Sequence, residues 1–504
     1  MAPRAPRVVA FFHTYMPDGK LDTYMEGLVA GFLGCGVELH IIKANDLVPS
    51  LGANNYSICI DEKKLVAHIH ALEPDFIFTT NRAGIGRMLI DNPGCPILTW
   101  LVDNTPFMHH GGTAADLYGK HDYVLTAVTN NVRLIERDYP NILPGRIFFM
   151  PFATSPEEFQ NAPACEKDIP ISFIGTYFYS YMLKDICARL KGDRENYNRL
   201  IDLIAVFEKS YEAVAEIEVE KRELGPILRK MGLTALEFKN IISNAVSLNR
   251  RLRVLDAVAD LGLKLYGTDN WTEVYQSSLP TLRAFQIHDA IDTREKLVNV
   301  YQRSKIAINV SHQQAIGGLP YRIYDLMASS AMLLADEESR TDLEYLFGKD
   351  CPIPLYRDPA HARELAAYYL AHEDERKAVV EKCNRLVAKG FGFSDRVRTM
   401  FETIGKPLPF PQTRMQQVQA VKPESFKIKQ EEQAPVQEPQ PQTPPPPPES
   451  QGTLTEVAHS IYAGKFRPLH YIYIHTPRRI RAPIGRFLRE CLPPSLYKTL
   501  ILWL

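Results

Sequence analysis

The sequence lacks several patterns that mark particular classes of protein. Its eight cysteines are scattered and no pair has the CxxC spacing; they stand at positions 35, 59, 95, 165, 187, 351, 383 and 491. This excludes a zinc site built on CxxC pairs and a dense disulfide framework, and it favours reduced thiols in a reducing compartment. Neither sign of charge dominates, because 58 Lys and Arg face 59 Asp and Glu. That balance argues against a dedicated nucleic-acid binder, which would be clearly basic.

Long hydrophobic runs are also missing. No stretch of 18 consecutive apolar residues occurs, and the first apolar run, 8–12, is too short for the core of a signal peptide. We therefore expect a cytoplasmic protein without a membrane span. Apolar residues make up 45% of the 504 positions, which is enough to bury the cores of roughly two to four domains.

One segment has too few apolar residues to fold on its own. Residues 411–450 contain ten prolines and nine glutamines and end shortly after five consecutive prolines. Such a composition does not offset the entropy lost on ordering, so we expect a Pro/Gln-rich disordered linker over 406–452. It separates a globular body, about 1–405, from a tail over 453–504.

The tail differs in charge from the body. It holds eight Lys and Arg against two Glu, a balance of +6, and it ends in the apolar residues 500–504. A basic amphipathic segment with an apolar end can lie on an anionic membrane surface, here the inner face of the membrane, or on a protein partner. The alternative is that the tail folds back on the body.

The body alternates short apolar runs with amphipathic segments. The runs that read as strands are 7–12, 37–42, 75–80, 96–103, 123–128, 146–153, 171–175, 263–267, 306–311, 331–336 and 353–356. Apolar strands alternating with helices are typical of α/β proteins with a parallel sheet covered on both faces. We expect two Rossmann-like, doubly wound domains that face a cleft, over 1–165 and 166–405, with a helical insertion at about 181–260. Ligands should bind beyond the carboxyl ends of the strands.

The segment 306–336 joins a strand to a helix through a glycine turn. Gly317 and Gly318 lie in the loop, and the helix should begin near Leu319 or Pro320. A helix start preceded by glycines offers backbone N–H groups and a positive dipole end, which suit a diphosphate.

Two charged residues follow on this helix. Arg322 can complete an anion site, and Asp325, three positions later, can accept hydrogen bonds from ribose hydroxyls. The alternative is a surface ion pair between Arg322 and Asp325, which would contribute little energy.

Four segments, in this order along the chain, resemble GT-B glycosyltransferases, most of all the CgeB-type (spore maturation) family. They are 100–106, with a tryptophan and an aspartate; 171–176, a strand and glycine turn; 265–271, L-Y-G-T-D-N-W, which resembles a Y-G-x-x-W element; and 318–328, with the G-L-P-Y-R turn. The resemblance spans about 5–405. It implies transfer of a sugar from a nucleotide-diphosphate sugar to a hydroxyl-bearing acceptor, which is a glycan, a lipid-linked glycan or a protein. It implies no metal and no cofactor, in keeping with the absence of a His, Cys and carboxylate cluster at ligand spacing.

The resemblance also implies donor-binding residues along the second domain. They are Gly175, Thr176, Tyr266, Gly267, Trp271, Gly317, Gly318, Leu319, Arg322 and Asp325. Tyr266 and Trp271 can cover the nucleobase, and the turn after Gly175 supplies hydroxyl donors. For these aromatic residues a place in the hydrophobic core is the alternative.

Three residues are candidates for catalysis. Asp103 follows an apolar strand and can act as base towards the acceptor hydroxyl, or it caps the next turn. His312, after another strand, can donate to a phosphate or sugar oxygen, or it is an ordinary loop residue. His13, at the first strand-to-loop junction, is a weaker candidate for the base.

Two departures from the resemblance keep other functions open. Asp325 stands where the second of two glutamates lies in retaining enzymes, and Gly317 falls where the first would lie. Ser330 also replaces a glycine common at the end of the helix. A catalytically silent scaffold is therefore the alternative function, and another nucleotide-sugar enzyme such as an epimerase is a third.

Overall fold

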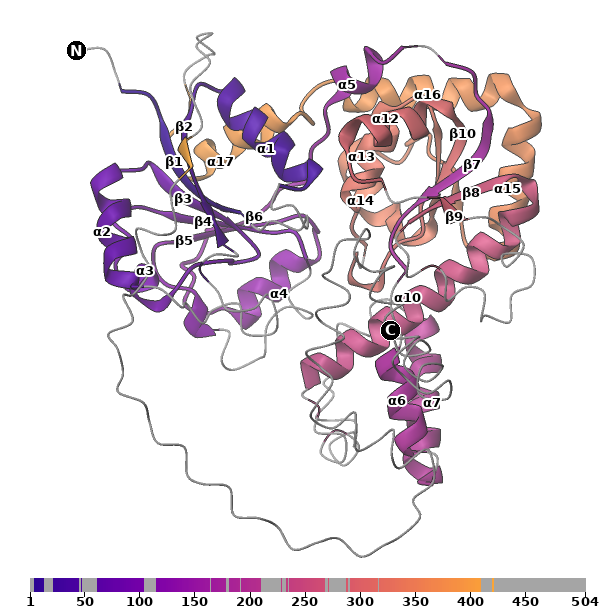
Figure 1. Cartoon of the computed structure of the whole chain (residues 1–504), viewed down its shortest axis with the longest axis horizontal. Coiled ribbons are helices and arrows are strands. Elements are labelled where there is room, and N and C mark those ends of the chain that lie inside the picture. The colour runs from indigo at the N-terminus through magenta and orange to yellow at the C-terminus, as the bar shows by residue number, and fades with distance from the viewer. Residues whose placement is uncertain are drawn as a thin grey trace, which may run out of the picture. The chain divides into compact units, whose positions relative to one another are not determined.

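The computed structural model describes residues 4–12, 21–44, 47, 61–103, 115–163, 165–177, 181–190, 192–209, 228, 233, 235–267, 271, 287–288, 291–315, 317–408 and 419–420. The chain divides into two compact units, and all of these residues belong to the one that comprises 1–16 and 20–428. Within this unit they form two parallel β-sheets, each flanked by helices (Figure 1). The part of the chain built on the first sheet is called the first lobe, and the part built on the second sheet is called the second lobe.

The first sheet has seven strands in the order β13-β2-β1-β3-β4-β5-β6, and every pairing is parallel. The strands are β1 (Arg7–Phe12), β2 (Glu38–Lys43), β3 (Phe76–Thr80), β4 (Ile97–Leu101), β5 (Asp122–Thr126), β6 (Ile147–Phe149) and β13 (Gln419–Ala420). Side chains of β1 alternate between two cores: Val8, Ala10 and Phe12 enter one, and Val9 and Phe11 enter the other. Burial on both faces explains the continuous apolar runs in the sequence.

Helices cover both faces of this sheet. One face packs against α1 (Thr23–Gly34) and α17 (Phe393–Thr403), and the other against α2 (Glu62–Leu72) and α3 (Arg87–Asp91). A further helix of this lobe, α4 (Asn131–Asp138), contacts β6. α17 reaches the first lobe although it falls inside the predicted second domain. In the contact between α1 and α17, Gly27 leaves room for the ring of Phe393 and Gly31 for its backbone.

The second sheet has six parallel strands in the order β12-β11-β10-β7-β8-β9. They are β7 (Ile169–Ile174), β8 (Leu263–Tyr266), β9 (Ile287–His288), β10 (Ser304–Ile308), β11 (Met332–Asp336) and β12 (Leu355–Tyr356). The strand order reverses between β7 and β10, which is the topological switch point where open α/β sheets bind ligands. The first sheet has its own switch point between β1 and β3.

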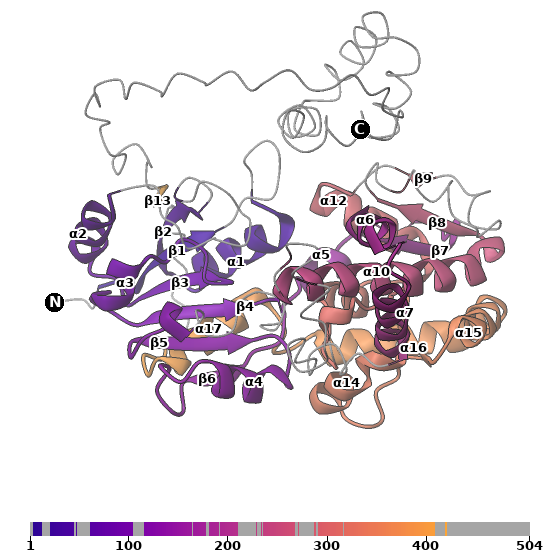
Figure 2. The same ribbon diagram turned by 90° about the horizontal axis from the view of Figure 1, so that it is seen from below.

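Helices cover this sheet as well. One face packs against α10 (Ala235–Val258) and α15 (Pro359–Ala371), and the other against α12 (Arg294–Arg303), α13 (Tyr321–Ala328) and α16 (Glu373–Val387). Figure 2 shows β7 and β8 lying between α12 and α15. The remaining helices are α5 (Pro156–Gln160), between β6 and β7, α14 (Arg340–Phe347), after β11, and the helices α6 (Tyr181–Leu190) and α7 (Arg194–Lys209), which precede α10.

The two doubly wound parallel sheets confirm the predicted fold class. All eleven predicted strands are present within the described ranges, with ends displaced by a few residues. The two-residue strands β9 and β13 were not predicted. β13 also lies inside the predicted linker, where Gln419 and Ala420 pair with β2. The predicted tail lies outside the described residues, and His13 does too. No helix within the described ranges is long and apolar enough to cross a membrane.

The loops at the carboxyl ends of the two sheets touch. Thr129, after β5, donates through its hydroxyl and its backbone N–H to the carboxylate of Asp342 in α14. A Cβ added to Gly318, after β10, would lie 2.5 Å from Val128, so only glycine allows this approach without displacement. The two edges at which α/β sheets bind ligands therefore meet in the folded chain.

Candidate functional site

Backbone and side-chain groups converge at the switch point of the second sheet. The carboxyl end of β7 leads into Gly175 and Thr176, and that of β10 leads into Val310 and His312. Arg251 of α10 joins the two ends, because its guanidinium donates to the carbonyl oxygens of Thr176 and Val310. The side chain is 2% exposed and lies over the ring of Phe173, 5.1 Å from its centroid.

A second arginine reaches the same place from α13. The Nη1 of Arg322 donates to the carbonyl oxygen of Ile174 at 3.1 Å, and a Cβ on Gly175 would lie 3.3 Å from that nitrogen. No carboxylate among the described residues forms an ion pair with Arg322; in particular, the alternative pair with Asp325 does not form. A guanidinium of this kind, half-buried and not neutralised, favours an anionic ligand.

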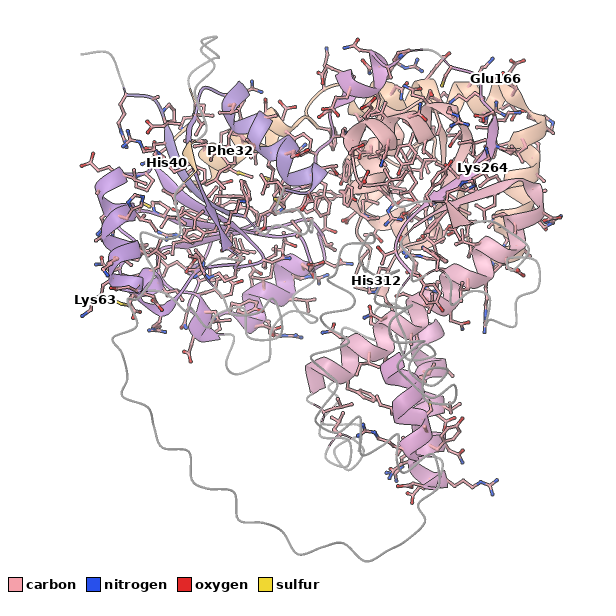
Figure 3. The ribbon with its side chains drawn as sticks, in the orientation of Figure 1. Phe32, His40, Lys63, Glu166, Lys264 and His312 are labelled. Carbon is pink, nitrogen blue, oxygen red and sulfur yellow. The ribbon has the colours of Figure 1, made fainter. Side chains whose placement is uncertain are left out.

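His312, labelled in Figure 3, follows β10 and lies within electrostatic reach of both arginines. Burial, followed by the positive charges of Arg251 and Arg322, lowers its pKa to about 3, so the imidazole is neutral at physiological pH. Its Nε2 lies 2.9 Å from the side-chain oxygen of Asn244, which only accepts hydrogen bonds. The proton of the neutral ring is therefore assigned to Nε2, and in this tautomer Nδ1 is an acceptor rather than the predicted donor.

The start of α13 is less open to a ligand than the sequence suggests. Leu319 is 1% exposed and belongs to a core cluster that contains residues of both lobes. The ring of Tyr321 lies 5.6 Å from that of Tyr24 and 6.4 Å from that of Phe152, measured between centroids. This packing weighs against the expected diphosphate seat on the helix start, and it gives Gly318 and Leu319 a role in the contact between the lobes. Gly317 adopts a left-handed φ of 71° in the same turn.

Asp325 is buried in a network that uses both of its carboxylate oxygens. Arg294 of α12 binds it in bidentate fashion, at 2.6 and 3.0 Å, and the hydroxyl of Thr154 donates to it at 2.7 Å. Arg294 also donates to Glu158 of α5 at 2.6 Å. The backbone N–H of Thr154 in turn donates to the carbonyl of Phe391, where the chain returns to the first lobe. The contacts of Asp325 thus tie α13 to both segments that connect the lobes.

We accordingly expect Asp325→Asn to reduce stability rather than donor affinity. The substitution leaves Arg294 with a weaker partner and turns an acceptor into a donor inside the network, at a cost of about 1–3 kcal/mol. Thermal unfolding with and without nucleotide sugar measures both quantities. An unchanged melting temperature combined with lost donor affinity would instead support the ribose-binding role that the resemblance implies.

The aromatic residues near β8 are packed into the protein. Trp271 is fully buried against Phe173 and Tyr177, and its indole N–H donates to the carbonyl of Gly175 at 2.9 Å. Tyr266 is 9% exposed, clusters with side chains of α12 and β7, and stacks on His288. Trp271 therefore holds the turn after β7. Gly267, next to Tyr266, donates its backbone N–H to the carbonyl of His288.

Asp103 lies two residues beyond β4 in the first lobe. It is exposed at the strand end, and partial desolvation of its carboxyl group by nearby protein atoms raises its pKa above the usual value. The side-chain amide of Asn81 donates to Oδ2 at 2.7 Å and opposes the rise. β4 neighbours β5, whose following loop contacts the second lobe, so Asp103 lies on the carboxyl edge that faces the arginines.

Sequence reasoning missed Arg251, Asn244 and Asn81. The first two lie in the predicted helical insertion, where Ser243, Ser247 and Arg251 follow at intervals of four. The spacing of these polar residues identifies one face of a helix, but it does not show which groups that face contacts. In the part of the chain that is described, no group of three or more His, Cys, Asp or Glu side chains has the arrangement of a metal site.

Comparison with known proteins finds a family match within residues 250–402. Residues 250–402 match the family described as glycosyl transferase-like. The chain is also similar to a glycosyltransferase from Rickettsia africae ESF-5, with 13% identity, a TM-score of 0.45 and coverage of 80% of this chain and 99% of that one. It is similar to HepE of Anabaena, solved with UDP and glucose, with 9% identity, a TM-score of 0.47 and coverage of 79% of this chain and 99% of that one. It is also similar to the sucrose-phosphate synthase of Thermosynechococcus elongatus, with 12% identity, a TM-score of 0.45 and coverage of 79% of this chain and 99% of that one. No curated protein matches. The segment that carries Arg251, His312 and Arg322 is therefore glycosyl transferase-like in sequence.

Proposed function

We propose that the chain is a glycosyltransferase of the GT-B, CgeB-type group that moves a sugar from a nucleotide-diphosphate sugar to an acceptor hydroxyl. The acceptor is a glycan, a lipid-linked glycan or a protein, and the reaction proceeds without a metal ion. We place the activity in the cytoplasm, with the 453–504 tail lying on the membrane surface or on a protein partner. The observation that carries the proposal is the unneutralised guanidinium of Arg322 at the switch point of a glycosyl transferase-like segment.

The geometry supports a division of labour between the two lobes. When the anomeric carbon–oxygen bond of the donor breaks, negative charge develops on the diphosphate. Arg322 and Arg251 would stabilise that charge within a site of low dielectric. The acceptor oxygen forms the new bond to the anomeric carbon and loses its proton to the carboxylate of Asp103.

The direct test is a panel of nucleotide-diphosphate sugars. We expect at least one to raise the melting temperature of the full chain, and to release its nucleoside diphosphate when a suitable acceptor is present. Thermal shift measures the first and a coupled nucleotide-release assay the second. If no nucleotide sugar binds and none is consumed, the chain is not a glycosyltransferase.

His312 provides an independent test of the anion site. A diphosphate beside the imidazole should favour its protonated form, because it offsets the charges of the two arginines. We expect pyrophosphate to raise the pKa of His312 from about 3, so that imidazolium is detectable by ¹⁵N NMR near pH 5. The signals of His372, at the end of α15, serve as the control and should not respond. An unchanged His312 titration in saturating pyrophosphate would place the anion elsewhere.

A catalytically silent scaffold is the second candidate. It is favoured by the start of α13, where the ring of Tyr321 packs against Tyr24 and Phe152 of the first lobe, next to the place that the resemblance gives to the donor. Under that alternative, nucleotide sugars neither stabilise the protein nor turn over. The same panel therefore separates the two functions.

A further inference from the structure

We infer that Asn81 is a positioning residue, which holds the carboxylate of Asp103 in place as the base for the acceptor hydroxyl. The inference rests on the proposed function, because it needs Asp103 to take up a proton. It assigns a role to a residue that makes no contact with the donor-binding groups described above.

Asn81 holds the end of β4 through three hydrogen bonds. Its side-chain oxygen accepts from the backbone N–H groups of Val102, at 2.9 Å, and Asp103, at 3.3 Å. Its side-chain nitrogen donates to Oδ2 of Asp103 at 2.7 Å. One buried amide, 8% exposed, therefore fixes the backbone and the carboxylate of the same residue. With Oδ2 engaged, Oδ1 is the oxygen placed to accept the proton.

The backbone that presents Asn81 is in an uncommon conformation. Asn81 and Arg82, directly after β3, have φ values of 49° and 63°. The left-handed region is unfavourable for residues other than glycine, tolerated by asparagine and strained for a long side chain such as that of Arg82. Two such residues in succession persist only when the surrounding structure holds them.

Arg82 is the residue that holds this turn. It is fully buried, and its guanidinium binds both carboxylate oxygens of Asp122, the hydroxyl of Thr99 and the carbonyl of Leu117. It also lies over the ring of Tyr118, 4.6 Å from the centroid. Leaving that guanidinium or Asp122 unpaired would be costly, so the ion pair maintains the turn. The strained backbone aims Asn81 at Asp103, at the edge where ligands bind, rather than into the core.

The hydrogen bond from Asn81 also affects the protonation of Asp103. Desolvation raises the pKa of Asp103 and the amide donor lowers it, because the donor stabilises the ionised form. Among the described residues, no charged side chain contributes to this balance. The hydrogen bond from Asn81 thus favours the ionised form of Asp103, which is the form that can accept a proton.

Asn81→Gly is the sharpest test. Glycine adopts the left-handed backbone at no steric cost, so the substitution removes the amide and keeps the turn. We expect kcat to fall by roughly 10- to 100-fold, and the acidic limb of the kcat/KM profile to move to higher pH by about 1. The KM for the donor should stay within about twofold, because the arginine site is untouched. ¹³C NMR of the Asp103 carboxyl group should show the same rise in pKa without turnover.

Asn92→Gly is the matched control, since Asn92 ends α3 in the same lobe and makes no contact with Asp103. If Asn81→Gly does not fold, Asn81→Asp takes its place. It keeps the two accepting bonds but replaces the donor with a second carboxylate, whose charge should raise the pKa of Asp103 more than the glycine variant does. The inference is overturned if a folded Asn81 variant has the same kcat and the same acidic limb as the wild type. In that case the wild-type enzyme still turns over the donor, and the proposed function stands. Absence of turnover in the wild type would overturn the proposed function, and the role of Asn81 with it.

Discussion

Replacing Arg322 with alanine is expected to raise the KM for the nucleotide sugar by about 10- to 100-fold, the range that one charge-assisted hydrogen bond to a phosphate contributes. Arg322 lies at the switch point and has no carboxylate partner among the described residues. Its charge is therefore available to a ligand rather than spent within the fold. Because charge is also needed as the diphosphate leaves, kcat should fall as well. Initial rates over a range of donor concentrations measure both effects.

Two variants make this result specific. Arg357→Ala removes an arginine that is well exposed outside the site, and it should leave donor KM unchanged. Arg322→Lys keeps the charge but not the planar fork, so its KM should lie between those of the wild type and the alanine variant. Thermal unfolding without ligand guards against a structural cause, since Arg322 also binds the carbonyl of Ile174. Normal donor KM in a folded Arg322→Ala variant would remove the residue from the site.

The strands and the general place of the site were readable from the sequence. Runs such as 306–311 and 331–336 are apolar on both sides because both faces of the sheet are covered, and that pattern survives without knowledge of the partners. Arg322 followed from a turn and a helix that are contiguous in the chain. Such local relations depend on neighbours in sequence, which the sequence displays directly.

The partners of the site residues were not readable in the same way. Asp325 was placed against a ribose, but its carboxylate binds Arg294 and Thr154, which are 31 and 171 positions away. Arg251 reaches the strand ends because α10 crosses them, and the orientation of a helix on a sheet is not encoded in its periodicity alone. From the sequence, Tyr266 and Trp271 were equally suited to covering a nucleobase or to a place in the hydrophobic core. Only the fold shows that both are packed inside the protein.

The left-handed turn at Asn81 is a further feature that pattern reasoning does not reach. Asparagine tolerates a positive φ but arginine does not favour one, so the residue types do not signal two such residues in succession. The turn exists because a buried ion pair outweighs the local preference of two residues. A position where local propensity and tertiary structure disagree in this way is a candidate for a functional role.

Asp103→Asn is expected to lower kcat for transfer by about 10²- to 10⁴-fold, the contribution of a well-placed general base. The substitution keeps the shape of the side chain and removes its ability to take a proton, so donor KM should change little. Since the base works only when ionised, the wild-type rate should fall as the pH drops through the pKa of Asp103. That pKa is raised above the usual value for an aspartate, and the limb should be absent in Asp103→Asn. Asp91→Asn, at an exposed position of α3 that pairs with Arg87, is the control and should retain both the rate and the limb. If Asp103→Asn transfers sugar at a rate near that of the wild type, another group takes the proton, and the geometry of Asn81 then serves the fold rather than the reaction.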